Sequence, residues 1–419
     1  MFRSRLLVVP VCVAMAALIV ACVEYPLAGA AFLFVVAAVA VPSRTLPAVA
    51  ILSWYGFHIP QLSASGGGLD GIFLSEAILA IWLLRETPGV LSRGPRVDAG
   101  STIFLGLVAW LLFTTFAAGS SGLPLFHLLL LGICMTAVSN GARIDYRYFV
   151  GALWIVMVME VLTTFEGFGQ RLYGSDPAQL GFIAIAVWAL TPVATLSRLP
   201  RYLVLSIPIL VVAFTQTRSI YFALCIAAVA RLIGRFNVVS AIVTFAGGLL
   251  FIAAVAQPLT DALGLSTNSL DLRLASLRGA LEISQENFGL GAGWAYRDSD
   301  ALAGITSQGY SVYNLLLSVV VAGGIVAGIL LIAFLGVKLW QANRYDLNAL
   351  LLLIAFVVIG VGEMPLFPGS IMAAILLLVI GRFDSRGVIG AQSSALPTAR
   401  TSEFEVAAMQ HAVPFTARS

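Results

Sequence analysis

Charge is scarce in this sequence. Asp, Glu, Lys and Arg make up 10% of its 419 residues, whereas they make up about 25% of an ordinary soluble domain. Hydrophobic residues make up 60%. This composition excludes a typical soluble domain and predicts an all-α, polytopic membrane protein that contacts the lipid bilayer directly. The net charge of +3 gives no support to nucleic-acid binding.

Metal ligands are scarce as well, since the sequence contains four cysteines and three histidines. All four cysteines lie within apolar segments and lack the spacing of metal ligands or paired loops, which predicts small core residues. The histidines are scattered, and no HExxH motif or Cys/His cluster exists. We therefore expect no disulfide, no metal and no cofactor.

Long apolar segments dominate what is present. About fourteen of them can cross the bilayer once their polar flanks are included. They cover residues 6–23, 27–41, 47–60, 71–84, 101–118, 125–139, 149–165, 178–196, 202–217, 219–233, 238–256, 310–337, 347–362 and 365–381. They predict a bundle of about 12–14 transmembrane helices, in which the first segment is a membrane helix and not a cleaved signal peptide.

Positive charge is distributed unevenly between the turns. With the N-terminus inside, the threading places 18 of the 23 Lys and Arg on the cytoplasmic side, as the positive-inside rule expects. We therefore expect both termini in the cytoplasm and the chain in a bacterial plasma (inner) membrane. The outward positive charge is confined to Arg171, Arg218, Arg273, Arg278 and Arg297. This confinement indicates a site for an anionic ligand on the outer face.

The domain organisation follows from the same segments. Residues 1–256 are predicted to form transmembrane helices 1–11, residues 310–382 helices 12–14, and residues 383–419 a flexible cytoplasmic tail. Between them, residues 257–309 form one long extracytoplasmic loop. Its middle predicts an amphipathic helix that begins near Asn268 or Ser269 and ends at Asn287. The apolar face of that helix is predicted to consist of Leu270, Leu274, Leu277 and Leu281.

Three local patterns carry candidate chemistry. Arg218 lies in Thr217-Arg218-Ser219 at the outer end of a helical hairpin, where an arginine must be hydrated, paired or ligand-bound, or must extend to the lipid headgroups. Arg273 and Arg278 are about 140° apart on a helix, so they cannot both point at one ligand. A glycine-rich exit, Asn287-Phe-Gly-Leu-Gly-Ala-Gly-Trp294, follows them, and Tyr313-Asn314 then enters a helix that carries Gly323 and Gly324.

In order and spacing these patterns resemble the O-antigen ligase and polymerase family of bacterial envelope glycosyltransferases. Arg218 matches the first arginine of that family, and Arg273 with Ala280-Leu281 matches the second. Asn287, Gly291 and Gly293 match the exit motif, and Asn314 and Gly324 match the last motif. The departures from the family pattern are Ser219 for Gly, Phe288 for Pro, Tyr313 for His and Ala322 for Glu. The resemblance covers roughly residues 170–335.

The resemblance implies glycan transfer on the outer face of the membrane, with a polyprenyl-diphosphate-linked oligosaccharide as donor. Arg218 and Arg273 would act on the diphosphate as catalytic residues, because arginines hold phosphates by bidentate hydrogen bonds and stabilise leaving-group charge. Arg278, Arg297, Arg171, Tyr313 and Asn314 would bind substrate. Other proteins of polysaccharide export or chain-length control are expected partners.

The general base is not singled out by any motif. Glu363 lies on the outer side between the last two predicted helices and is our catalytic candidate, with Asp176 and Glu166 as alternatives. Glu76 and Glu160 lie within apolar segments and have no evident partner in the sequence. We expect a polysaccharide polymerase, because the absent His disfavours a ligase. A flippase or transporter for the same lipid-linked sugars is the alternative from another class.

Overall fold

The structure is a computed structural model of the 419-residue chain. It describes residues 40–57, 71–94, 98–119, 123–164, 177–191, 198–215, 217–233, 278–287, 289–294, 296, 314–366 and 370–381. The predicted segments 6–23 and 238–256, most of 27–41, and the predicted tail 383–419 lie outside these residues. Within them the chain is helical and forms no strand, which agrees with the predicted all-α class.

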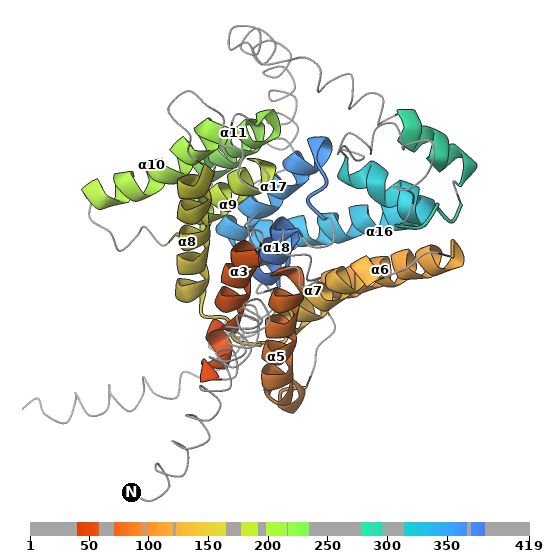
Figure 1. Ribbon diagram of the computed structural model, residues 1–419, viewed down its shortest axis with the longest axis horizontal. Helices are drawn as coiled ribbons and strands as arrows, with labels where there is room; N and C mark the ends of the chain where they lie inside the picture. The colour runs from red at the N-terminus through yellow and green to blue at the C-terminus, as the bar shows by residue number, and fades with distance from the viewer. Residues whose placement is uncertain are drawn as a thin grey trace, which may run out of the picture.

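A short 3-10 helix, η1 (Ser43–Thr45), precedes the α-helices of the described part (Figure 1). These are α3 (Leu46–Phe57), α5 (Gly71–Ser92), α6 (Ala99–Ala117), α7 (Leu123–Ser139), α8 (Tyr146–Thr164), α9 (Pro177–Leu190), α10 (Arg198–Thr215), α11 (Arg218–Ile233), α16 (Leu315–Tyr345), α17 (Leu347–Gly362) and α18 (Ile371–Ile380). Each overlaps one of the predicted apolar segments. Among the described helices, α6, α8 and α16 are long and apolar enough to cross a membrane.

Two helices continue well past their apolar segments. The α5 helix runs to Ser92 and not to residue 84, and α16 runs to Tyr345 and not to residue 337. Polar contacts explain the extra turns of α5, because Arg85 donates to the carbonyl of Val41 at 2.7 Å and Glu86 accepts from the Ser43 hydroxyl at 2.6 Å. Hydropathy alone does not detect such turns, because the residues that stabilise them are charged and therefore fall outside the apolar segment.

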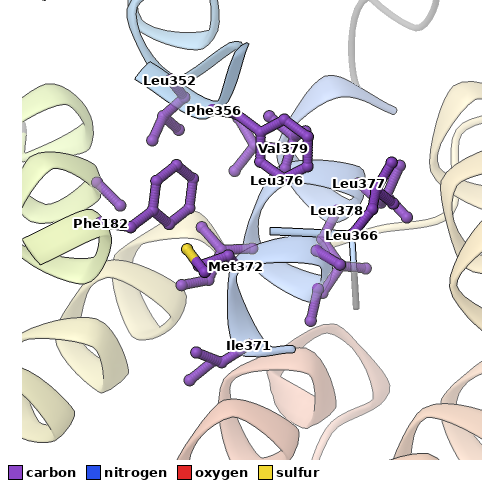
Figure 2. Packing of buried hydrophobic residues seen from close by; sticks show 14 of the residues in the cluster. Phe182, Leu352, Phe356, Leu366, Ile371, Met372, Leu376, Leu377, Leu378 and Val379 are labelled. Atoms are coloured by element: carbon purple, nitrogen blue, oxygen red, sulfur yellow. The ribbon is translucent and has the colours of Figure 1, made fainter. Parts of the chain in front are cut away.

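The helix α18 lies at the centre of the described bundle (Figure 1). Every residue from Ile371 to Ile380 is buried, as expected for a helix that is apolar on all sides. Figure 2 shows Met372 beside Phe182 of α9 and Phe356 of α17, whose rings meet edge to face at 6.1 Å. The Tyr146 hydroxyl of α8 donates to the carbonyl of Leu378 at 3.2 Å. The core therefore joins the early and late helices.

The lateral surface of the bundle, like its core, is apolar. Ile329 and Ile332 of α16 are 59% and 58% exposed, and Ile325, one turn earlier, is 41% exposed. A water-facing helix would place polar residues at these positions, so this face suits lipid. Near the end of α16, the Arg344 guanidinium lies 5.7 Å from the ring centre of Trp340. An aromatic residue paired with arginine is typical of a membrane boundary.

The basic turns of the first helices meet at one end of the bundle. The amide of Asp145 donates to the carbonyl of Arg44 at 2.8 Å, and the amide of Arg143 donates to Glu86 at 3.1 Å. The turn before α3, the last part of α5 and the turn before α8 therefore lie together. Helices that alternate in direction produce this arrangement.

An ion pair joins α6 to the second half of α16 near the same polar termini. Asp98 caps α6, and its Oδ2 lies 2.6 Å from the Nζ of Lys338, whose side chain is fully buried. Gln341 donates to Asp98 Oδ1 at 2.9 Å. The charge pattern of the sequence predicts Lys338 in a cytoplasmic turn, but it is a buried residue within α16. Gly100 makes room for the buried stem, because a Cβ there would overlap Lys338 Cε.

Burial alone would raise the pKa of Asp98, but the Lys338 ammonium and the hydrogen bonds from Lys338, Gln341 and Ser101 outweigh it and hold that pKa below its ordinary value. A depressed carboxyl pKa stabilises the fold above the pKa of the unfolded chain, which is about 3.9. The stabilisation is lost as the pH falls below that value. At neutral pH Asp98 is therefore ionised.

Separate replacement of each partner tests this pair. Asp98→Asn keeps a good helix cap but leaves the Lys338 ammonium without a carboxylate, so we expect the free energy of unfolding to fall by about 3–5 kcal/mol. The double variant Asp98→Asn/Lys338→Met removes the buried charge and should recover most of that loss. Denaturant unfolding of the purified protein in mild detergent measures both. Equal stability of the single variant and the wild type would contradict a buried charge pair.

Candidate functional site

The helix α16 is broken at Gly324. This residue has φ +68° and ψ −169°, a conformation that is essentially limited to glycine. A Cβ on Gly328 would meet the side chain of Val320 at 2.7 Å, although residues eight apart in a straight helix are about 12 Å apart. The chain therefore folds back sharply after Gly323 (Figure 1). The sequence predicted one continuous helix over 310–337, and this prediction is wrong.

The break frees backbone carbonyls, and neighbouring segments bind them. The amide of Ala292 donates to the carbonyl of Val321 at 2.8 Å, and the amide of Gly293 donates to that of Ala322 at 2.9 Å. The indole Nε1 of Trp110 on α6 donates to the carbonyl of Gly323 at 2.7 Å. Each carbonyl at the break thereby gains the partner that a continuous helix would have given it.

Glycines in the exit loop make this approach possible. A Cβ on Gly291 would overlap the backbone nitrogen of Gly324, so the two glycines touch backbone to backbone. Gly293 packs closely on Thr115 of α6, because a Cβ on Gly293 would lie 3.0 Å from the Cα of Thr115. The Thr115 hydroxyl also accepts from the amide of Trp294 at 2.9 Å. Gly291 and Gly293 have positive φ values of 81° and 74°, respectively.

The helical turns that precede the exit loop were predicted in part. Residues 278–286 are helical, and Asn287 ends them, with both its amide and its side chain donating to the carbonyl of Ile283 at 3.1 Å. The buried face, however, is formed by Ala280, Ile283 and Ser284. Leu281, which the sequence assigns to the apolar face, is 46% exposed and lies outside this buried face. Leu270, Leu274 and Leu277 lie outside the described residues.

Asn314 and Glu363 come together at the ends of α16 and α17. The Asn314 carbonyl oxygen accepts from the amide of Leu317 at 2.9 Å and so caps α16. Its Nδ2 donates to the carbonyl of Val361 at 3.1 Å, two residues before Glu363, which ends α17 and is half-buried. A predicted substrate-binding residue and the predicted base are therefore near neighbours.

Arg218 is the first residue of α11. The adjacent α9 begins beside it, since a Cβ on Gly181 would meet Ile220 at 2.5 Å. The Ser219 hydroxyl is buried and has no hydrogen-bond partner. The positive ends of two helix dipoles thus lie together at a position that the sequence marks with an arginine, and such ends favour anions.

The other predicted site residues are distributed as follows. Arg278 begins the helical turns of residues 278–286 and is exposed. Arg171, Arg273, Arg297 and Tyr313 lie outside the described residues, so their predicted roles stay predictions. The same holds for the alternative bases Glu166 and Asp176.

Sequence reasoning missed a second polar pair. Nδ1 of His127 on α7 lies 2.7 Å from Oε1 of Glu76 on α5, which gives Glu76 the partner that the sequence did not reveal. The only signal was that each is an isolated ionisable residue in an apolar segment. Fifty-one residues separate them, so no local pattern links them.

The comparisons with known proteins are negative. No protein-family model matches the chain, and no curated protein matches its sequence. The family resemblance described above is therefore based on residue patterns alone.

The glycine at the break provides a test of the site's architecture. We expect Gly324→Ala to lower the free energy of unfolding by at least about 1–3 kcal/mol, because alanine cannot adopt this backbone conformation and its Cβ would meet Gly291. Gly336→Ala is a matched control in the same helix, where a Cβ would contact nothing within 4 Å. The control should be neutral or stabilised by about 0.5–1 kcal/mol. Equal effects of the two variants in unfolding experiments would contradict the break.

Proposed function

We propose that this protein is a glycosyltransferase of the bacterial inner membrane that joins polyprenyl-diphosphate-linked oligosaccharide repeat units into a longer polysaccharide. The observation that carries the proposal is the contact between the exit loop and the break of α16. Gly291 and Gly324 belong to two motifs that the sequence matched separately to the polymerase and ligase family. Their direct contact supports treating the motifs as parts of one site.

The proposed orientation places this site outside. In a bundle of about 12–14 helices with cytoplasmic termini, the turns of Arg44, Arg85 and Arg143 face the cytoplasm. The exit loop, Arg218 and Glu363 then lie at the outer end. The meeting of the basic turns supports the first part of this assignment.

The proposed reaction needs positive charge at the leaving group. An acceptor hydroxyl attacks the anomeric carbon of the donor, and the bond to the polyprenyl diphosphate breaks with its electron pair on the diphosphate. Arg218 at the start of α11, together with Arg273 from the loop, would stabilise that charge by bidentate hydrogen bonds. The adjoining start of α9 adds a second positive helix end.

The acceptor side is assigned to Asn314 and Glu363. Glu363 would take the proton of the attacking hydroxyl, and Asn314 would hold a sugar or keep the end of α17 in place through Val361. Both sit at the ends of helices. Carboxylates at such positions can reach a substrate that approaches from the outer face.

A transporter of the same lipid-linked sugars is the second candidate, and the broken helix favours it. Transporters commonly place broken helices near the bilayer midplane. Here the segment of α16 after the break is about 20 residues long, which gives it roughly 30 Å, enough to span the hydrocarbon core by itself. The break therefore belongs at the outer boundary, and this position supports an enzyme that acts on a substrate at the outer surface.

Replacement of Arg218, the first residue of α11, tests the proposal, and replacement of Arg198, the first residue of α10, is its control. Arg218→Ala should reduce the formation of glycan polymer at least about a hundredfold, because the developing diphosphate charge loses a bidentate partner. Arg273→Ala should have a similar effect. Arg198→Ala changes the first residue of α10, at the opposite end of that helix from Arg218, and should leave polymer formation unchanged.

Polymer length is measured on lipid-linked glycans from cells that contain equal amounts of each variant in the membrane. Full polymer formation by Arg218→Ala would contradict the diphosphate site. Loss of transfer to a final acceptor, with full-length lipid-linked polymer still made, would identify a ligase instead.

A further inference from the structure

The pair formed by Glu76 and His127 lies between two apolar helices and is not among the residues assigned above. Glu76 is on α5 and His127 on α7, and both helices are apolar around these positions. The His127 side chain is 3% exposed, whereas that of Glu76 is 24% exposed. Ionisable residues are costly in such surroundings, and their presence marks a functional site by default.

The geometry of the pair fixes where the imidazole carries its proton. An ionised carboxylate can only accept, so with Glu76 ionised the 2.7 Å contact places a hydrogen on Nδ1 of His127. In the neutral ring, Nε2 is then a bare acceptor. That atom is buried and has no hydrogen-bond partner. An unpaired acceptor is unfavourable when buried, whereas a proton on it would make the ring a cation beside the Glu76 carboxylate.

We propose that Glu76 and His127 form a proton-binding site. The proton binds Nε2, and the resulting imidazolium is held by the adjacent Glu76 carboxylate. Glu76 is partly exposed and gives the proton access from outside the bundle, whereas His127 is buried and binds the proton. The proposal does not depend on the glycosyltransferase activity.

No competing charge lies close to the ring among the described residues. On α3, Trp54 meets the imidazole edge to face at 5.2 Å, and its neighbour Tyr55 is the titratable residue of that helix. The helices α6 and α18, which also pack on α7, contain no titratable residue. On α7 itself the other titratable residue is Cys134, two turns further along. On α5 the other charged residues are Arg85 and Glu86, more than two turns beyond Glu76, so among the described residues Glu76 is the charge in contact with the ring.

The test observes the ring nitrogens directly. His58 and His411 are replaced by Gln, so that His127 is the one remaining histidine, and the protein is labelled with ¹⁵N-histidine in lipid nanodiscs. At neutral pH we expect the NMR spectrum of a neutral ring with hydrogen on Nδ1 and a bare Nε2. In mildly acidic buffer Nε2 should gain a hydrogen, reversibly.

Glu76→Gln is the matched variant, because its amide oxygen still accepts from Nδ1 but carries no charge. We expect it to keep the neutral tautomer and to lower the ratio of doubly to singly protonated ring at least about tenfold in the same acidic buffer. A wild-type ring that keeps a single proton on acidification would overturn the proposal and leave a fixed structural hydrogen bond. Equal protonation in the Glu76→Gln variant would overturn it as well.

Discussion

The pairing of the carbonyls freed at Gly324 is the constraint on which the described site depends. A helix break leaves backbone carbonyls without their helical partners, and where the break is buried, as at Gly324, other protein groups must bind them. Here two amides of the exit loop and the indole of Trp110 provide the partners. The loop must therefore come close enough to touch α16, and glycine at 291 and 324 allows that approach, while Gly293 lets the same loop pack on α6.

This constraint also explains the place of α6. Its C-terminal half supplies Trp110 and Thr115 to the break and the loop, and its N-cap residue Asp98 meets α16 again at Lys338. The helix is thus fixed to α16 at two points, one neutral and one charged. The two ionisable pairs seen among the described residues differ in their surroundings. Asp98 and Lys338 are closed by Gln341 and Ser101 and have a structural role, whereas His127 retains a bare nitrogen.

Much of the helical framework could be predicted from the sequence, because an apolar run long enough to cross a membrane has few alternatives to a helix. The end of the loop helix at Asn287 was predicted for similar local reasons. The break at Gly324 was not, because glycine is common in membrane helices that are continuous. Lys338 was misplaced because charge near a segment end indicates a turn unless its partner is known. Glu76 and His127 needed the packing of α5 on α7, which no local pattern contains.

The proposed polymerase activity is the central claim, and the lipid-linked glycans of a deletion strain test it most directly. The measurement identifies which polyprenyl-linked glycans accumulate when the gene is removed from its bacterial host, and on which membrane face. The account predicts single repeat units on the outer face. Single units held on the inner face, or no change in any lipid-linked glycan, would contradict it.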